Sequence, residues 1–239
     1  AAFGETMCAL AEKNPKVCAI TAAMPGGTGL LTFSREHKSR LFDVGIAEEH
    51  AVSMAGGLAK QGMVPVVALY STFLQRSYDM ILQAVAMLRL HVVLAVDRAG
   101  LVGEDGETHH GIYDIGFLRH APGLRILCPG SRQELRDMLR WAVEQYHGPV
   151  AIRYPRGTEG SYQASDWNGL EGELVKCHRT GKDVTLITYG SLLDNALEAA
   201  KLLSDSGIEA TVLRLTQISP LRIEEIRSYI PVSKLVFTV

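Results

Sequence analysis

The chain has 239 residues, 47% of them hydrophobic and 21% charged, a composition that excludes a disordered, collagen-like or disulfide-scaffold protein. It carries 24 basic and 26 acidic residues, a net charge of −2, and no run of basic residues, so nothing indicates nucleic-acid binding. No apolar run reaches the roughly 20 residues that cross a bilayer. Four cysteines lie far apart without a CxxC pair, and this usage, with no signal-like N-terminus, predicts a reduced, cytoplasmic protein.

Short apolar runs alternate with segments of helical periodicity over residues 1–157. The apolar runs predict strands that are buried on both faces, at residues 17–21, 40–44, 63–68, 92–96, 125–128 and 150–153. Apolar side chains at i, i+3 and i+4 spacing predict helices at residues 3–13, 46–61, 73–87 and 131–144. This alternation predicts an α/β domain whose parallel sheet is covered by helices on both faces.

The composition changes after residue 157. Residues 158–170 are rich in glycine, serine, aspartate and asparagine, which predicts an exposed linker. Residues 171–239 predict a second α/β domain, with strands at 184–188, 210–215 and 235–239 and a helix at 192–206. Because the chain stops within its last apolar run, we expect this second domain to be incomplete.

Acidic side chains follow the predicted strand at residues 40–44. Glu48 and Glu49 fall in the first turn of the next helix, beside the strand ends at which open α/β sheets bind ligands. Carboxylates in a first helical turn also stabilise the helix dipole. The position alone therefore permits either a catalytic or a purely structural role.

The segment from Asp97 to Gly111 is a long strand-end loop with four glycines and the adjacent histidines His109 and His110. Neighbouring histidines on an extended loop point apart, so this pair fits acid–base catalysis or anion binding better than a metal site. An ordinary solvent-exposed loop is the alternative. We expect no metal ligands in this chain.

The segment Tyr70 to Arg76 also joins a strand to a helix and offers hydroxyl, aromatic and guanidinium groups. Each has a structural alternative: Thr72 as a helix cap, Phe73 in the core, and Arg76 in a surface pair with Asp79 or Asp43. Arg98 and Arg156 are two further cations near predicted strand ends. Each alone is explained as a surface charge, but together they can meet near one crevice and bind a phosphorylated substrate.

Together, these motifs resemble the middle and C-terminal sections of the 1-deoxy-D-xylulose-5-phosphate synthase family, which are thiamine diphosphate enzymes of the transketolase superfamily. Two strings distinguish this family from transketolases and from 2-oxo-acid dehydrogenase beta subunits: Tyr-Ser-Thr-Phe-Leu-Gln-Arg at 70–76 and Asp-Arg-Ala-Gly-Leu-Val-Gly at 97–103. The resemblance implies a thiamine-diphosphate pyrimidine-binding domain with a parallel sheet, followed by a truncated transketolase C-terminal-like α/β domain.

The resemblance also implies a reaction in which pyruvate loses CO2 and its two-carbon unit is transferred to D-glyceraldehyde 3-phosphate. The product, 1-deoxy-D-xylulose 5-phosphate, leads to isoprenoid, thiamine and pyridoxal precursors. Glu48 would contact the cofactor's aminopyrimidine through a carboxyl that burial keeps protonated, and Phe73 would stack on that ring. His109 and Arg76 would be further catalytic residues. The implied substrate-binding residues are Tyr70, Arg98, Asp105, His109 and Arg156.

One departure from the family concerns the Gly-Asp-Gly motif that holds Mg²⁺ and the diphosphate, because this chain has none. The string Gly-Glu-Asp-Gly at residues 103–106 lies in the substrate loop and is not equivalent. We therefore expect the chain to need an N-terminal diphosphate-binding domain or subunit, to be inactive alone, and to form a homodimer that covers Glu48 and Phe73. Two alternatives stay open: a transketolase or 2-oxo-acid dehydrogenase beta-type subunit, and a catalytically silent partner subunit.

Overall fold

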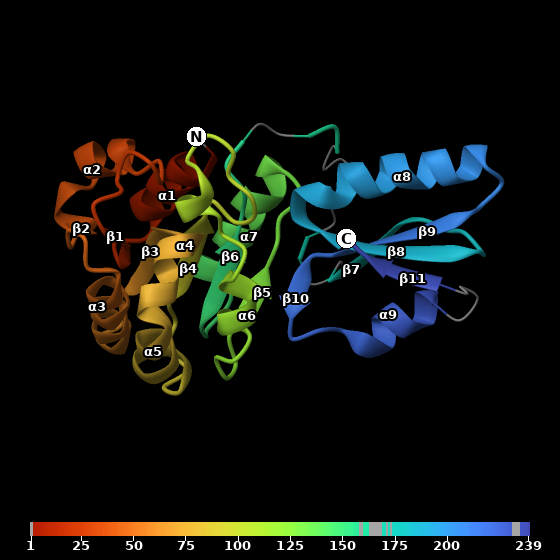
Figure 1. Cartoon of the computed structure of the whole chain (residues 1–239). Coiled ribbons are helices and arrows are strands. Elements are labelled where there is room, and N and C mark those ends of the chain that lie inside the picture. Colours follow the sequence, from red (N-terminus) through yellow and green to blue (C-terminus); the bar gives the residue numbers. More distant parts are fainter. Residues whose placement is uncertain (1, 158–159, 163–168, 171, 173, 231–234) are drawn as a thin grey trace. The chain divides into compact units, whose positions relative to one another are not determined.

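The computed structural model describes residues 2–157, 160–162, 169–170, 172, 174–230 and 235–239, and Figure 1 shows its helices and strands. The chain divides into two compact units. Unit 1 contains residues 1–127 and 135–157, and unit 2 contains residues 128–134 and 158–239. No helix among the described residues is long and apolar enough to cross a membrane.

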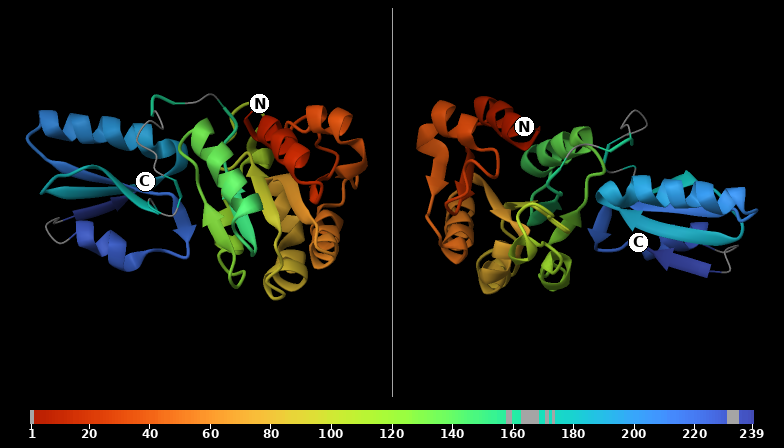
Figure 2. Two further views of the ribbon diagram at one scale, coloured as in Figure 1. Left: turned by 180° about the vertical axis from the view of Figure 1, so that it is seen from behind. Right: turned by 45° about the horizontal axis from the view of Figure 1, so that its top comes forward.

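Unit 1 is built on a parallel sheet in which the strands follow the order β5-β6-β4-β3-β1-β2. Every residue of β1, β4 and β6 is buried, as their continuous apolar sequences predict. Figure 2 shows α1 and α7 on one face of this sheet and α3 and α5 on the other. The strands are β1 (Val17–Thr21), β2 (Leu41–Asp43), β3 (Val64–Tyr70), β4 (Val93–Asp97), β5 (Arg125–Leu127) and β6 (Val150–Arg153).

Three of the four helices predicted in this region are confirmed, as α1 (Ala2–Lys13), α3 (Glu48–Lys60) and α7 (Arg132–Glu144). The fourth prediction, one helix over residues 73–87, is wrong in detail. The segment is a series of short helical turns of different types. The sequence did not predict this, because apolar periodicity shows which face of a helix is buried but not the hydrogen-bond pattern of each turn. These turns are α4 (Ser71–Leu74), η2 (Gln75–Ser77), α5 (Tyr78–Met80) and the π-helical η3 (Ile81–Ala86).

Four short elements of unit 1 were not predicted, because their sequences carry too few residues for a period to show. Two lie between β1 and β2, and two lie between β4 and β5. They are α2 (Leu31–Glu36), η1 (Lys38–Arg40), η4 (Glu107–His109) and α6 (Asp114–Leu118).

Unit 2 contains a four-stranded sheet in the order β11-β8-β9-β7. Strand β8 (Val184–Tyr189) pairs in parallel with β9 (Ala210–Leu215) and β11 (Leu235–Thr238), whereas β7 (Val175–Arg179) runs antiparallel to β9. The three strands predicted here are confirmed, and the predicted helix is α8 (Leu193–Asp205), preceded by η6 (Gly190–Leu192). The elements that were not predicted are β7, β10 (Gln217–Ser219) and α9 (Ile223–Tyr229).

The core of unit 2 lies between α8 and its sheet, where Leu186, Leu193 and Val212 are almost fully buried. Residues 158–159 and 163–168 of the predicted linker lie outside the described residues. Within the described part, the backbone amide and the hydroxyl of Ser161 donate to the Asp194 carboxylate at 2.9 and 2.6 Å. This contact attaches residues 160–162 to the N-terminal turn of α8.

Candidate active site

Glu48 is the first residue of α3 and its side chain is 3% exposed. The Nη1 atom of Arg76, a side chain that is 51% exposed, donates to Glu48 Oε1 at 2.8 Å. Arg76 therefore pairs with Glu48 and not with Asp43 or Asp79, and Glu49 in the same turn is exposed. The role expected for Glu48 stays a prediction.

The loops that precede α2 and α3 are joined by Asp43, the last residue of β2. Its Oδ1 accepts hydrogen bonds from the backbone amides of Ala23 at 2.7 Å and Gly45 at 3.1 Å. Both residues have positive φ, of 58° and 72°, which is unfavourable for alanine. This role of Asp43 was not predicted from the sequence, although its place at a strand end is a signal for it.

Three rings gather at the end of β3. The Tyr70 and Phe73 rings are stacked with centroids 5.8 Å apart, and the His109 and Phe73 rings form a T-shaped pair with centroids 5.3 Å apart. The Arg76 guanidinium lies 5.1 Å from the centroid of Phe73. Phe73 is only partly buried, so it is not an ordinary core residue. Its ring contacts both Arg76, which pairs with Glu48, and His109.

The 98–111 loop is attached to α4 through a hydrogen bond from a side chain of α4 to the loop backbone. Thr72 Oγ1 donates to the Thr108 carbonyl at 3.1 Å, and Thr108 Oγ1 lies 3.0 Å from His109 Nδ1. Thr72 makes no side-chain cap for α4, so that alternative is also wrong. His110 differs from its neighbour because its Nδ1 accepts the amide of Val102 at 2.9 Å, a contact that stabilises the loop itself.

Two arginines converge on one carboxylate beside these rings. Arg98 Nε donates to Asp105 Oδ2 at 2.8 Å, and Arg156 donates from Nη1 to Asp105 Oδ1 and from Nη2 to Glu104 Oε2, the latter at 2.6 Å. Arg156 and, to a lesser extent, Arg98 lower the pKa of Asp105 from 3.8 to about 2. The Arg98 guanidinium also lies over the Tyr70 ring, 3.6 Å from its centroid.

Arg98 is itself held in an unusual conformation, with φ at 59°. Its backbone amide donates to Asp97 Oδ1 at 2.7 Å and its Nη1 donates to the Gly27 carbonyl at 3.3 Å. Burial raises the pKa of Asp97 from 3.8 to about 6, and Arg98 opposes that rise. The contacts of Asp97 and Gly27 with Arg98 were not predicted, because they depend on backbone segments that only the fold brings together.

The predicted site residues thus form one chain of contacts at the carboxyl ends of strands β2, β3, β4 and β6. In order of contact they are Glu48, Arg76, Phe73, His109, Tyr70, Arg98, Asp105 and Arg156. Such an edge is where ligands bind in open α/β sheets. One end of the chain offers a buried carboxylate beside an aromatic face, and the other offers two convergent guanidinium groups.

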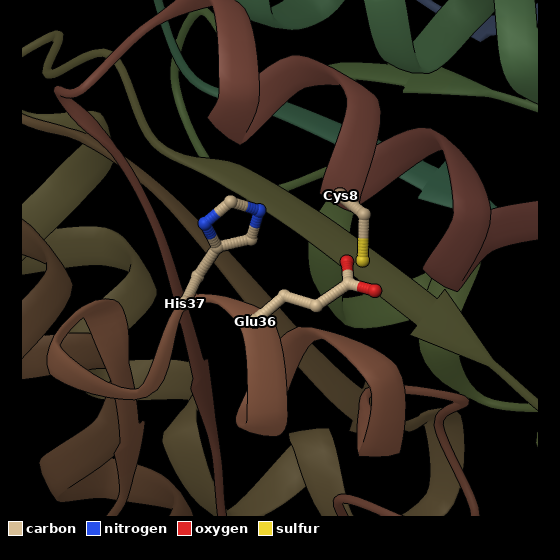
Figure 3. A group of neighbouring side chains, drawn as sticks. All are labelled: Cys8, Glu36 and His37. Carbon is tan, nitrogen blue, oxygen red and sulfur yellow. The ribbon is translucent and has the colours of Figure 1, made fainter.

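One group of possible metal ligands occurs in the described part of the chain, away from this network. Ligand atoms of Cys8, Glu36 and His37 lie within 4.8 Å of one another, and Figure 3 shows the three side chains pointing together. Arg40 Nη2, however, lies 2.8 Å from His37 Nδ1. Because a guanidinium can only donate, the ring proton is on Nε2, which then has no lone pair for a metal.

The cysteine of this group is also poorly suited to a metal. Burial, together with a hydrogen bond to Glu36, raises the pKa of Cys8 to about 11, and metals bind the thiolate. We interpret Cys8 and Glu36 as a hydrogen-bonded contact between α1 and α2, beside which His37 pairs with Arg40.

Comparison with known proteins identifies both parts of the chain. The family described as the transketolase pyrimidine binding domain matches residues 1–159, and the transketolase C-terminal domain matches residues 173–239. The 1-deoxy-D-xylulose-5-phosphate synthase of Desulfitobacterium hafniense strain Y51 is 48% identical over 99% of the chain, and that of Chlorobium luteolum is 50% identical over 92%. The chain spans only 38% and 35% of the lengths of these two relatives.

Solved structures agree in fold. A split-gene transketolase, described as an inactive beta4 tetramer, matches the whole chain and 77% of its own length with a TM-score of 0.86 and 28% identity. The transketolase of Campylobacter jejuni matches the whole chain and 41% of its own length with a TM-score of 0.82 at 16% identity. The chain therefore belongs to the transketolase family, with a pyrimidine-binding domain and a C-terminal domain similar to those of 1-deoxy-D-xylulose-5-phosphate synthases.

Proposed function

We propose that this chain provides the pyrimidine-binding part of a thiamine-diphosphate-dependent synthase that joins pyruvate to D-glyceraldehyde 3-phosphate with loss of CO2. The observation that carries the proposal is the network described above, in which a buried carboxylate and an aromatic face adjoin two arginines. A transketolase C-terminal-like domain after a linker at 158–170 completes the proposed organisation. The proposed site of action is the cytoplasm.

The residues at one end of the network fit the cofactor's pyrimidine. Glu48 is a buried acceptor at the start of a helix, and Phe73 offers a partly buried ring face for stacking. When bound, thiamine diphosphate supplies the group that stabilises a carbanion at the substrate's carbonyl carbon. In the proposed role, Glu48 holds or moves a proton at the pyrimidine nitrogen, and Arg76 keeps this carboxylate in place.

The residues at the other end fit the phosphorylated substrate. Arg98 and Arg156 present guanidinium groups that bind phosphate oxygens through charge-assisted hydrogen bonds, and Tyr70 supports Arg98 through its ring. His109 lies between the two ends, so we place it beside the reacting atoms.

The chain has no Gly-Asp-Gly motif, and we propose that Mg²⁺ and the diphosphate are held mainly by a separate N-terminal domain or subunit. The similar split-gene transketolase is described as an inactive beta4 tetramer, which supports the expectation that this chain is inactive alone. A homodimer that covers Glu48 and Phe73 would exclude water from the site.

The test is turnover of pyruvate and D-glyceraldehyde 3-phosphate by this chain mixed with a polypeptide that carries the Gly-Asp-Gly domain. We expect activity only in the mixture. Glu48→Gln keeps the shape of the side chain and is expected to lower kcat about 100-fold or more, whereas Glu49→Gln, in the same turn but exposed, should change it less than about twofold.

Four other outcomes would contradict parts of the proposal. Activity of the chain alone would exclude the need for an N-terminal partner. Full activity of Glu48→Gln would remove Glu48 from the chemistry. A product formed only from a ketose donor or on a lipoyl acceptor would favour a transketolase or dehydrogenase-type subunit, and no activity with any donor would favour a silent subunit.

A further inference from the structure

The carboxylate of Asp105 occupies the point at which the two arginines converge. One of its oxygens accepts from Arg98 Nε and the other from Arg156 Nη1. Guanidinium groups bind the oxygens of a phosphate in the same way. Glu104 accepts from the remaining donor group of Arg156, at Nη2, so both arginines already have anionic partners within this chain.

The local charge is also unfavourable for an incoming anion. Asp97, Glu104 and Asp105 place three carboxylates beside the two guanidinium groups of Arg98 and Arg156. A phosphate monoester that entered this arrangement would be repelled by the carboxylates at short range. The phosphate can form ion pairs with the two arginines only after the Glu104 and Asp105 carboxylates have moved away from them.

The loop that carries these carboxylates is anchored at its base and open at its tip. At the base, Gly100 and Gly111 exchange two backbone hydrogen bonds, each 2.8 Å long. At the tip, Glu104 is 83% exposed, and a Cβ added at Gly103 or Gly106 would meet no atom within 4 Å. The tip can therefore move without breaking the bonds at the base.

We propose that Glu104 and Asp105 occupy the phosphate-binding position of Arg98 and Arg156 in the ligand-free chain, so that a phosphorylated substrate binds by displacing them. The inference rests on the proposed function for its phosphorylated substrate. It adds a basis for selectivity. A monocarboxylate would only exchange one carboxylate for another, whereas a phosphate dianion brings a second charge to the two arginines. The two carboxylates therefore direct these arginines toward phosphate monoesters and away from substrates such as pyruvate.

The experiment measures the dissociation constants of inorganic phosphate and of acetate for the 239-residue chain by titration calorimetry. Ionic strength is kept constant, at about pH 8 where phosphate is a dianion. Asp105→Asn is expected to tighten phosphate binding roughly tenfold and to make acetate binding measurable. Glu104→Gln should tighten phosphate binding about threefold, because its ion pair is solvent-exposed.

Glu107→Gln is the matched control, since it removes the same charge from the same loop at an exposed position that makes no ion pair with either arginine among the described contacts. It should change the phosphate constant less than about twofold. Equal or weaker phosphate binding by Asp105→Asn, with binding intact in the wild type and in Glu107→Gln, would overturn this inference and leave the proposed function standing. Absence of phosphate binding in every variant would overturn both.

Circular dichroism of each variant separates displacement from unfolding. Glu104→Gln alters a side chain that is 83% exposed, so it should keep the fold and retain the test if Asp105→Asn does not. No change in phosphate affinity in a folded Glu104→Gln variant would also count against the inference.

Discussion

Arginine–carboxylate clusters occur in both units of this chain, and their surroundings differ. In unit 2, Arg214 pairs with Glu134 through two hydrogen bonds, and both side chains are 0% exposed. The remaining capacity of Glu134 is used by the Tyr162 hydroxyl at 2.9 Å and by the Gly130 amide at 2.7 Å. This cluster is closed, because each carboxylate oxygen accepts two hydrogen bonds and water is excluded.

The cluster in unit 1 is open. Arg156 is 40% exposed and Glu104 is 83% exposed, and the backbone of Arg98 has the unfavourable positive φ noted above. Asp105 bridges the two arginines without comparable burial. Removing either partner of a buried ion pair such as Glu134–Arg214 costs much stability. An exposed pair can exchange one partner for another at little cost in free energy. The comparison separates a structural ion pair from one that is available to a ligand.

The largest effect is expected from breaking the closed cluster. Glu134→Ala leaves the Arg214 guanidinium buried without its carboxylate, and we expect the free energy of unfolding of unit 2 to fall by about 3–5 kcal/mol. The measurement is urea unfolding followed by circular dichroism. Glu224→Ala, which removes an exposed partner of Arg227 in the same unit, should have a far smaller effect. Similar losses in the two variants would mean that burial does not distinguish the pairs.

A slightly smaller effect is expected from the buried carboxylate beside the open cluster. The pKa of Asp97 is about 6 in the folded chain and 3.8 when unperturbed, so the folded state binds this proton more tightly between these pH values. Stability contributed by Asp97 is therefore present below about pH 4 and is lost as the pH rises through about 6, by about 3 kcal/mol in total.

Asp97→Asn removes this dependence while keeping an oxygen that can accept the Arg98 amide. The variant should therefore be the more stable protein at pH 8, and its advantage should shrink as the pH falls from 6 to 4. Thermal unfolding of both proteins across this range checks the sign. Asp105 titrates lower, because its pKa is about 2, so its loss of ion pairing in acid does not overlap with this window. A constant difference between the two proteins would contradict the buried, destabilising carboxylate.

Much of the fold and of the site could be predicted because the signals are local. The strand Val17–Thr21 is mostly apolar and buried throughout, Glu48 lies shortly after β2, and Arg98 directly follows β4. The chain of contacts could not be predicted in the same way, since Arg156 meets Asp105 across 51 positions and Arg76 meets Glu48 across 28. These pairings depend on strand order, and residue type alone does not distinguish a partner from a solvent-exposed charge.

The smallest effect is expected from a change that shifts Tyr70, whose ring contacts the Arg98 guanidinium. A Cβ at Gly27 would lie 1.6 Å from the Tyr70 hydroxyl, whereas a Cβ at Gly26 would find its nearest neighbour at 3.9 Å, in Leu31. Gly27→Ala must therefore displace Tyr70, whose ring supports Arg98, and we expect a loss of about 1–3 kcal/mol in stability together with weaker phosphate binding. Gly26→Ala should leave both thermal unfolding and the phosphate titration nearly unchanged. Equal behaviour of the two variants would show that the open cluster adjusts to a shifted Tyr70 and does not depend on this close contact.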